Sequence, residues 1–256
     1  MDSLTFTNPR GLTLAAHLWE TPGEAAVVLV HGFCSDKASN GRFEVLSAAL
    51  QEAGIAALAF DLAGCGASED AMLDAAGMIG DTAAACALLR RQGKTRIALF
   101  GNSLGGSICL KAALPGIAAI AASGAATASM PYDWSTHCAA PQLEELEQDG
   151  VITEPVESAW RESVTIGAQM LLDFTETARA PALERLACPV LLLYGDDPAD
   201  AEEQALLALA RANLARLPAG SRIETIAGQR HGLRGAWPAA VGRIVPWLAR
   251  HLQAPT

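Results

Sequence analysis

Short apolar runs that alternate with longer helical patterns constrain the fold of this chain more than any other feature. Six runs of five or six residues are mostly apolar, as strands buried on both faces should be: residues 25–30, 55–60, 96–100, 117–122, 190–194 and 222–226. Between most of them lie Ala- and Leu-rich stretches whose polar residues fall on one side, at residues 43–53, 78–91, 104–114, 201–217 and 236–251. This alternation predicts an α/β fold, a mostly parallel, doubly wound sheet with ligands bound beyond the carboxyl ends of its strands.

Two parts of the chain depart from the alternation. Residues 4–7 and 12–19 read as two strands around a turn at 8–11, which predicts an opening hairpin. Residues 125–187 give mixed signals and are too long for an ordinary strand-to-helix connection, so we expect an inserted lid before the strand at 190–194. The predicted organisation is a core of residues 1–124 and 188–256 with a lid of residues 125–187. The apolar stripe of the lid is expected to pack against the main body: Ile166, Met170, Leu171 and Phe174.

Composition limits the partners that this chain can have. Its 256 residues, 51% of them apolar, are enough to bury a full core. A formal charge of −10 argues against binding to nucleic acid and to anionic membranes, and favours a small neutral or apolar ligand. The six cysteines form no C-x-x-C pair and have no zinc-ligand spacing, so buried free thiols are expected. With no signal-peptide pattern and no apolar run of membrane-spanning length, we expect a cytoplasmic protein.

A single serine lies between two glycines directly behind the apolar run at 96–100. The pattern is Gly101-Asn102-Ser103-Leu104-Gly105. A sharp strand-to-helix turn would expose the Ser103 hydroxyl at the head of a helix, and side chains in place of Gly101 and Gly105 would collide with neighbouring backbone. Unpaired N–H groups and the positive end of the helix dipole would lie beside that hydroxyl. Ser103 is therefore the candidate nucleophile.

A serine hydroxyl needs an imidazole to take its proton and a carboxylate to orient that imidazole. Of the five histidines, His231 follows the last predicted strand, on a loop that returns to the sheet edge where Ser103 lies. His17, His137 and His251 lie in the opening hairpin, the lid and the C-terminal end, which are poor positions for this task. His231 is therefore the predicted base.

The acid should come from the loop that follows the strand at 190–194, where three aspartates compete. Asp200 fits helix capping best, because it stands directly before the predicted helix at 201–217. Asp197 is preferred as the acid, because the following Pro198 holds the loop extended away from the helix. Asp196 stays open as the alternative. The resulting order of nucleophile, acid and base along the chain is that of enzymes with a nucleophile elbow.

Attack on a carbonyl creates an oxyanion, which requires two N–H groups about 3 Å from the oxygen. The N–H of Leu104, at the helix start, is one expected donor. The other is expected from the His-Gly-Phe-Cys turn at residues 31–34, where Phe33 is preferred and Cys34 is the alternative. The Cys34 thiol is not expected to be a second nucleophile, because no base stands beside it in the sequence.

Five segments together resemble the successive signatures of the alpha/beta-hydrolase family: VVLVHGFCSDK, AFDLAGCGASE, FGNSLGGS, LLLYGDD and IAGQRHGL. The spacings H-G-F-x-x-x-K and D-x-x-G-x-G-x-S are similar to those of small bacterial carboxylesterases of the feruloyl or cinnamoyl esterase type and their serine-aminopeptidase-like relatives. The resemblance implies roles for the residues at the matching positions: nucleophile Ser103, acid Asp197, base His231, oxyanion donors Phe33 and Leu104, and a structural turn at Asp61, Gly64, Gly66 and Ser68. One departure concerns the acid, because Pro198 stands where the family usually has it.

These observations predict a serine hydrolase that cleaves carboxylic esters of small to medium apolar or aromatic acyl groups through an acyl-enzyme, without a metal or organic cofactor. A thioesterase, a peptidase or an acyltransferase would use the same catalytic parts. The rival from another class is a non-catalytic small-molecule receptor on a hydrolase fold. Activity is expected to rise with pH through the imidazole pKa, normally near 6.5.

Overall fold

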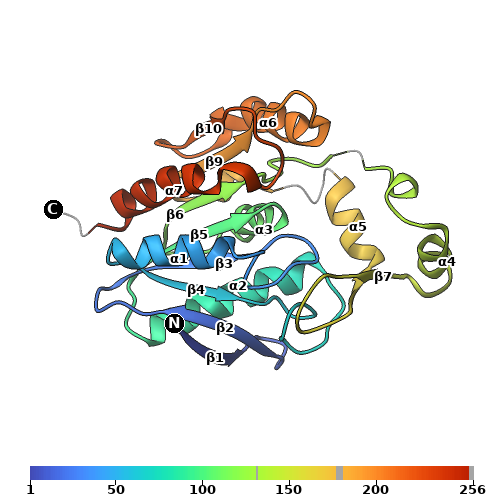
Figure 1. The fold of residues 1–256 in the computed structure, drawn as a ribbon, viewed down its shortest axis with the longest axis horizontal. Helices are drawn as coiled ribbons and strands as arrows, with labels where there is room; N and C mark the ends of the chain where they lie inside the picture. The colour runs from blue at the N-terminus through green and yellow to red at the C-terminus, as the bar shows by residue number, and fades with distance from the viewer. Residues whose placement is uncertain (131, 177–180, 254–256) are drawn as a thin grey trace.

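An eight-stranded sheet forms the centre of the computed structural model (Figure 1), which describes residues 1–130, 132–176 and 181–253. In spatial order the strands are β1 (Asp2–Thr7), β2 (Thr13–Trp19), β4 (Ala56–Phe60), β3 (Ala25–Val30), β5 (Arg96–Asn102), β6 (Ile117–Ser123), β9 (Val190–Gly195) and β10 (Arg222–Ile226). β2 pairs antiparallel with β1 and with β4, and the other neighbours are parallel. The predicted α/β fold and the opening hairpin are confirmed.

Helices cover both faces of the sheet, which explains why the central strands are apolar throughout. On one face lie α1 (Arg42–Glu52) and α7 (Trp237–Leu252), seen in front of the strands in Figure 1; on the other lie α2 (Ala75–Arg91), α3 (Leu104–Ala112) and α6 (Ala201–Asn213). Alternate residues of β3 divide between the two cores: Val28 and Val30 pack with α2 and α3, whereas Val27 and Leu29 pack with α1 and α7. A strand buried on both sides has no polar face to show in its sequence.

Between positions 125 and 187, the described residues form a group of elements at the carboxyl end of the sheet, on the right of Figure 1. They are a 3₁₀ turn (Trp134–Thr136), α4 (Ala140–Asp149), the hairpin of β7 (Val151–Pro155) and β8 (Ser163–Gly167), α5 (Ala168–Thr175) and a second 3₁₀ turn (Leu183–Arg185). Ile166, Met170 and Leu171 are buried in the same core as Leu73, as expected. Phe174 is half-buried, and its ring packs edge-on against Phe33 with 5.9 Å between centroids. That this segment moves as a lid stays a prediction.

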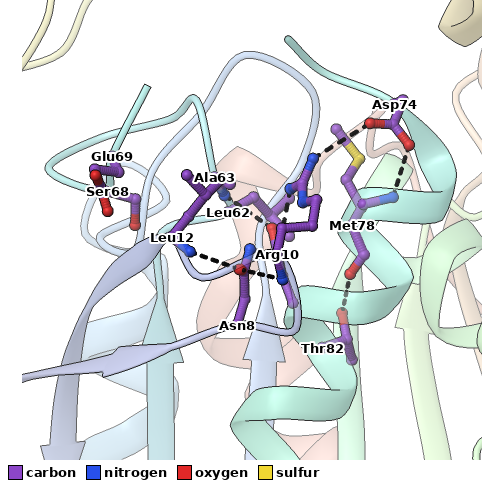
Figure 2. A network of polar contacts seen from close by, with 12 residues as sticks. Asn8, Arg10, Leu12, Leu62, Ala63, Ser68, Glu69, Asp74, Met78 and Thr82 are labelled. Carbon is purple, nitrogen blue, oxygen red and sulfur yellow. Dashed lines mark hydrogen bonds and ion pairs between the residues drawn. The ribbon is translucent and has the colours of Figure 1, made fainter. Parts of the chain in front are cut away.

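A buried carboxylate on α2 ties the opening hairpin to the loop after β4. Asp81 is 1% exposed, and its oxygens accept hydrogen bonds from Asn8 Nδ2 (2.6 Å) and Ala63 N (2.9 Å). The other end of the Asn8 amide accepts the N–H groups of Arg10 and Leu12, both at 2.9 Å, and so closes the turn. Figure 2 shows Arg10 reaching from this turn towards Asp74 at the start of α2. The network joins the loop after β4 to α2 and to the opening hairpin.

Replacing Asp81 by alanine is expected to lower the free energy of unfolding by about 2 kcal/mol, because the buried N–H of Ala63 and the amide of Asn8 lose their acceptor. Burial raises the pKa of Asp81 above its ordinary 3.8, against the hydrogen bonds from Ala63 and Asn8. The folded protein therefore holds this proton more tightly than the unfolded chain, and the contribution of Asp81 falls as pH rises through the raised pKa.

Urea unfolding at about pH 5 and about pH 8 checks this, with a larger loss expected at the lower pH. Glu52→Ala removes the same charge from the exposed end of α1 and serves as the control. An Asp81→Ala protein as stable as the Glu52→Ala protein would contradict the proposed role of the network.

All six cysteines are free thiols, and four of them are buried, as the sequence predicted: Cys65, Cys86, Cys109 and Cys188. Within residues 1–130, 132–176 and 181–253, no helix has the length and apolar character needed to cross a membrane.

Candidate active site

Ser103 occupies a sharp turn between the end of β5 at Asn102 and the start of α3 at Leu104. Its backbone angles, φ 53° and ψ −120°, lie in a region that residues with a side chain rarely adopt. The turn is also crowded: a Cβ on Gly101 would lie 2.3 Å from the carbonyl carbon of Gly105, and a Cβ on Gly105 would lie 2.1 Å from the carbonyl oxygen of Val30. The predicted need for glycine on both sides of the serine is confirmed.

The structure brings Ser103 and His231 together across 128 positions of the chain, with 2.9 Å between Ser103 Oγ and His231 Nε2. The parallel pairing of β10 with β9 causes this approach, because it places Ile226 beside Gly195 and sends the following loop to the carboxyl edge of the sheet. Ser103 reaches the same edge from β5. The predicted proximity of these two residues is therefore observed.

Glu203 is the carboxylate that contacts the imidazole. Its Oε2 lies 2.6 Å from His231 Nδ1, and its Oε1 accepts the backbone N–H of Gly195 at 2.7 Å. The residue lies in the first turn of α6 and is fully buried. Both carboxylate oxygens are thus held, one by the end of β9 and one by the ring of His231.

The prediction that Asp197 is the carboxylate beside His231 is wrong. Its carboxylate accepts hydrogen bonds from Arg230 Nε and Ala199 N, both at 2.9 Å. The bond from Arg230 lowers the pKa of Asp197. The alternative, Asp196, accepts the N–H of Gly228 at 2.6 Å. The physical reason lies in the short loop after β9, which turns both aspartates outward and starts α6 early enough for the first turn of the helix to reach the ring.

Glu203 carries a sequence signal that an inspection of the loop alone misses. It lies on the buried face of α6 together with Leu206, Leu207 and Ala210, which follow it at helical spacing. A carboxylate on the apolar stripe of a helix must find a buried partner. Here that partner is His231.

Asp200 caps α6, as predicted, and also holds the histidine loop. Its Oδ1 accepts the N–H of Glu203 at 3.0 Å, which is a helix N-cap bond. Its Oδ2 accepts the N–H of His231 at 2.8 Å. One side chain therefore fixes the backbone of both residues that meet behind Ser103.

The protonation of His231 follows from its neighbours. Burial lowers the pKa of the imidazole, but the hydrogen bond and charge of Glu203 and the charges of Glu202 and Asp200 outweigh it and raise the pKa above 6.5. In the neutral ring, the carboxylate of Glu203 favours the proton on Nδ1. Nε2 is then left as the acceptor for the Ser103 hydroxyl.

A cavity of ≈ 270 Å³ opens in front of Ser103 and His231, and Phe33 and Cys34 also line it. Gly32 places the Phe33 turn against the serine, since a Cβ on Gly32 would lie 3.5 Å from Ser103 Cβ. Leu104 is the first residue of α3, so its N–H has no carbonyl one turn earlier in the helix. Burial raises the pKa of Cys34, which keeps this thiol protonated and supports the expectation that it is not a nucleophile.

Buried polar contacts brace the turn that carries Phe33. His31 Nε2 accepts the N–H of Leu62 at 3.1 Å, and its Nδ1 lies 2.8 Å from the carbonyl of Gly32. Further along the loop, Lys37 Nζ forms a buried ion pair of 2.7 Å with Asp61. Asp61 also accepts the N–H of Ala67, which gives the structural turn that the resemblance implied for Asp61, Gly64, Gly66 and Ser68.

Among the residues that the structure describes, no group of three or more His, Cys, Asp or Glu side chains is arranged to hold a metal ion. The groups that meet at the site are a hydroxyl, an imidazole and a carboxylate. This is the set that activates a serine for attack on a carbonyl.

Comparisons with known proteins bear on the fold and the family. No curated protein matches the chain in sequence. Among solved structures, the alpha/beta hydrolase GrgF from Penicillium sp. sh18 is 18% identical, with a TM-score of 0.77 over 98% of each chain. The monoacylglycerol lipase of Paleococcus ferrophilus is 23% identical, with a TM-score of 0.72 over 93% of this chain and 99% of that one.

The esterase domain of a Rhodothermus marinus protein is also 23% identical, with a TM-score of 0.69 over 98% of this chain and 99% of that one. At these identities the likeness establishes the fold. A model of the Alpha/beta hydrolase family matches residues 27–240, from the strand before the Phe33 turn to the helix after His231. With most of its length covered by that match, this chain belongs to the alpha/beta hydrolase family.

Proposed function

We propose that this protein is a serine hydrolase that cleaves carboxylic esters through an acyl-enzyme. One observation carries the proposal: an unbroken line of contacts from Ser103 Oγ to His231 Nε2 (2.9 Å) and from His231 Nδ1 to Glu203 Oε2 (2.6 Å). The hydroxyl that begins this line faces a cavity large enough to admit a small substrate. Nucleophile, base and acid are thus Ser103, His231 and Glu203.

In the first step, Ser103 Oγ attacks the carbonyl carbon of the ester while His231 Nε2 takes the hydroxyl proton. The carbonyl oxygen becomes an oxyanion, for which the N–H groups of Phe33 and Leu104 are the proposed donors. The intermediate collapses, the bond to the leaving oxygen breaks, and His231 gives that oxygen its proton. In the second step, His231 takes a proton from water, the hydroxide adds to the acyl carbon, and Ser103 leaves with the proton.

Glu203 stabilises the imidazolium that forms in each step and holds the ring in the required tautomer. Its own position depends on the N–H of Gly195, which occupies the second carboxylate oxygen at 2.7 Å. A carboxylate held on both oxygens cannot turn away when the ring is neutral.

The proposed substrates are esters of small to medium apolar or aromatic acids. A second cavity of ≈ 30 Å³ lies beside the start of α3, and the apolar side chains of Leu104, Ile108, Met170 and Phe174 are among those that line it. It is much smaller than the ≈ 270 Å³ cavity at Ser103, so most of an acyl group would occupy that larger cavity. Two of the structural neighbours are named an esterase and a monoacylglycerol lipase, which also act on esters. A small-molecule ester in the cytoplasm remains the proposed partner and setting.

A fluorophosphonate probe followed by peptide mass mapping tests the proposal. We expect one covalent adduct on the peptide that contains Ser103, together with hydrolysis of p-nitrophenyl esters. A parallel panel of acyl-CoA and aminoacyl amides separates an esterase from a thioesterase or a peptidase. If the folded protein takes no label and turns over none of these compounds, the proposal fails and a ligand receptor on this fold becomes the better account.

A further inference from the structure

Two arginines line the Ser103 cavity on the side of His231. Arg234 follows His231 by three residues and is exposed, and Arg42 is the first residue of α1 and is half-buried. Arg42 Nη1 donates to the carbonyl of Gly232 at 2.8 Å, and its Nε donates to the carbonyl of Ser39 at 2.9 Å. The guanidinium of Arg42 therefore joins the loop after β3 to the loop that carries His231.

Neither guanidinium has a counter-ion in the described part of the chain. Among the described residues, no carboxylate oxygen lies within 4.0 Å of a guanidinium nitrogen of Arg42 or Arg234. Burial, and then the neighbouring charge of Arg234, lower the pKa of Arg42, so the two cations act on each other. Two like charges held together at the mouth of a cavity favour the binding of an anion.

The same cavity has two carboxylates, which belong to other segments. Asp36 comes from the loop after β3, and its oxygens accept the N–H of Ala38 (2.9 Å) and the hydroxyl of Ser158 (3.4 Å). Glu157 comes from residues 125–187. The loop of His231 contributes three residues to the lining of this cavity: His231, Gly232 and Arg234. Apart from the histidine, Arg234 is the charged side chain among them.

Catalysis decides which half of a substrate meets this loop. His231 Nε2 must give its proton to the leaving oxygen or sulfur, so the leaving group lies against His231 and the residues that follow it. We propose that this site accepts esters or thioesters whose leaving group carries a carboxylate or a phosphate, and that Arg234 binds that anion while Arg42 adds its charge. The proposal rests on the proposed hydrolase function and adds a substrate class to it.

A guanidinium binds a carboxylate and a phosphate in the same way, through paired N–H donors, so both anions are candidate ligands of Arg234. Arg42 uses three of its five N–H donors on Ser39 and Gly232. Arg234 therefore supplies the direct contact. The acyl half then falls on the other side of Ser103, towards the apolar cavity beside Leu104.

Two matched pairs of substrates test the assignment with the purified full chain. The first pair is 3-butyryloxybenzoate and its methyl ester, which share an acyl group and a phenolic leaving oxygen and differ in the carboxylate. The second is S-butyryl-4′-phosphopantetheine and S-butyrylpantetheine, which share a thioester and differ in one phosphate. We expect kcat/KM to favour the anionic member of at least one pair by about tenfold, mostly through KM. A preference within the first pair indicates that the site recognises a carboxylate, and a preference within the second pair indicates that it recognises a phosphate.

Arg234→Gln is expected to abolish the preference, so that kcat/KM becomes equal within about twofold for the two members of the pair. Added salt is expected to weaken the preference of the native protein. Arg230→Gln is the matched control: it removes an equal charge from the same loop, but Arg230 pairs with Asp197 outside the cavity lining. Equal rates within both pairs, or a preference that survives in Arg234→Gln, would overturn the assignment while the hydrolase proposal stands. Absence of any Ser103-dependent turnover would instead remove the hydrolase proposal itself.

Discussion

Replacing Ser103 by alanine is expected to lower kcat/KM for an activated ester by at least about 10⁴-fold, because Ser103 carries the hydroxyl that contacts the base His231. Burst kinetics with a p-nitrophenyl ester measure both effects, since the acyl-enzyme burst and the steady rate should disappear together. The fold is expected to persist, because the side chain is small and its polar contact is made with His231 at the cavity.

Ser103→Gly gives a sharper control for the same residue. The backbone at φ 53° and ψ −120° suits glycine better than serine, so this variant is expected to be inactive and yet at least as stable as the native protein. Thermal unfolding by circular dichroism measures the stability. An inactive variant that is also unfolded would leave catalysis unassigned, and a fully active one would show that Ser103 is not the nucleophile.

Glu203→Gln is expected to lower kcat by about 10³- to 10⁴-fold, because an amide cannot stabilise the imidazolium and can hold the ring in the wrong tautomer. The pH profile provides the second readout. In the native protein, activity should rise with pH through an imidazole pKa above 6.5, since Glu203 contributes most to raising it. Without that carboxylate, burial dominates, and the inflection of the residual activity should move to lower pH.

Asp197→Ala and Asp196→Ala are the matched controls, because each removes a carboxylate from the loop directly after β9. Both are expected to stay within about threefold of the native rate and to keep its pH profile, since their partners are Arg230 and Gly228. An Asp197→Ala protein as damaged as Glu203→Gln would reverse the assignment of the acid.

The sequence predicts the serine turn because the turn depends on short-range rules, and it predicts the sheet edge at which the histidine lies because that depends on strand topology. Glycines two residues before and after Ser103 act within one turn of backbone, and the collisions that they avoid are with atoms close at hand. His231 is located by topology, since parallel strands deliver their following loops to one edge. Neither inference needs the conformation of a loop.

The acid is not predictable in the same way, because it depends on where a helix begins. The choice between a loop aspartate and Glu203 depends on the residue at which α6 begins, and sequence rules place helix ends poorly. Pro198 is the sequence signal that the acid lies elsewhere, because it occupies the position at which the resemblance places the acid. The buried face of α6 then selects Glu203, once the orientation of the helix is known.

Residues 125–187 resist prediction for a different reason. Each strand of the β7 and β8 hairpin has only five residues, so the alternation of buried Val164 and Ile166 with exposed Thr165 is too short to mark a strand in the sequence. It is held by contacts distant in sequence, such as those from Arg161 to the carbonyls of Gly66 (2.9 Å) and Ser68 (2.7 Å). Trp160 lies over Lys37, with 3.7 Å from Nζ to the ring centroid. Such tertiary anchors leave no local pattern.

The two N–H bonds to Asp200 have a mechanical consequence. Because the backbones of Glu203 and His231 are both bonded to Asp200, a displacement of the start of α6 is expected to move the two residues together. The 2.6 Å contact between them is then preserved. Such a displacement changes instead the 2.9 Å distance between His231 Nε2 and Ser103 Oγ. This is the distance across which the proton moves in each turnover.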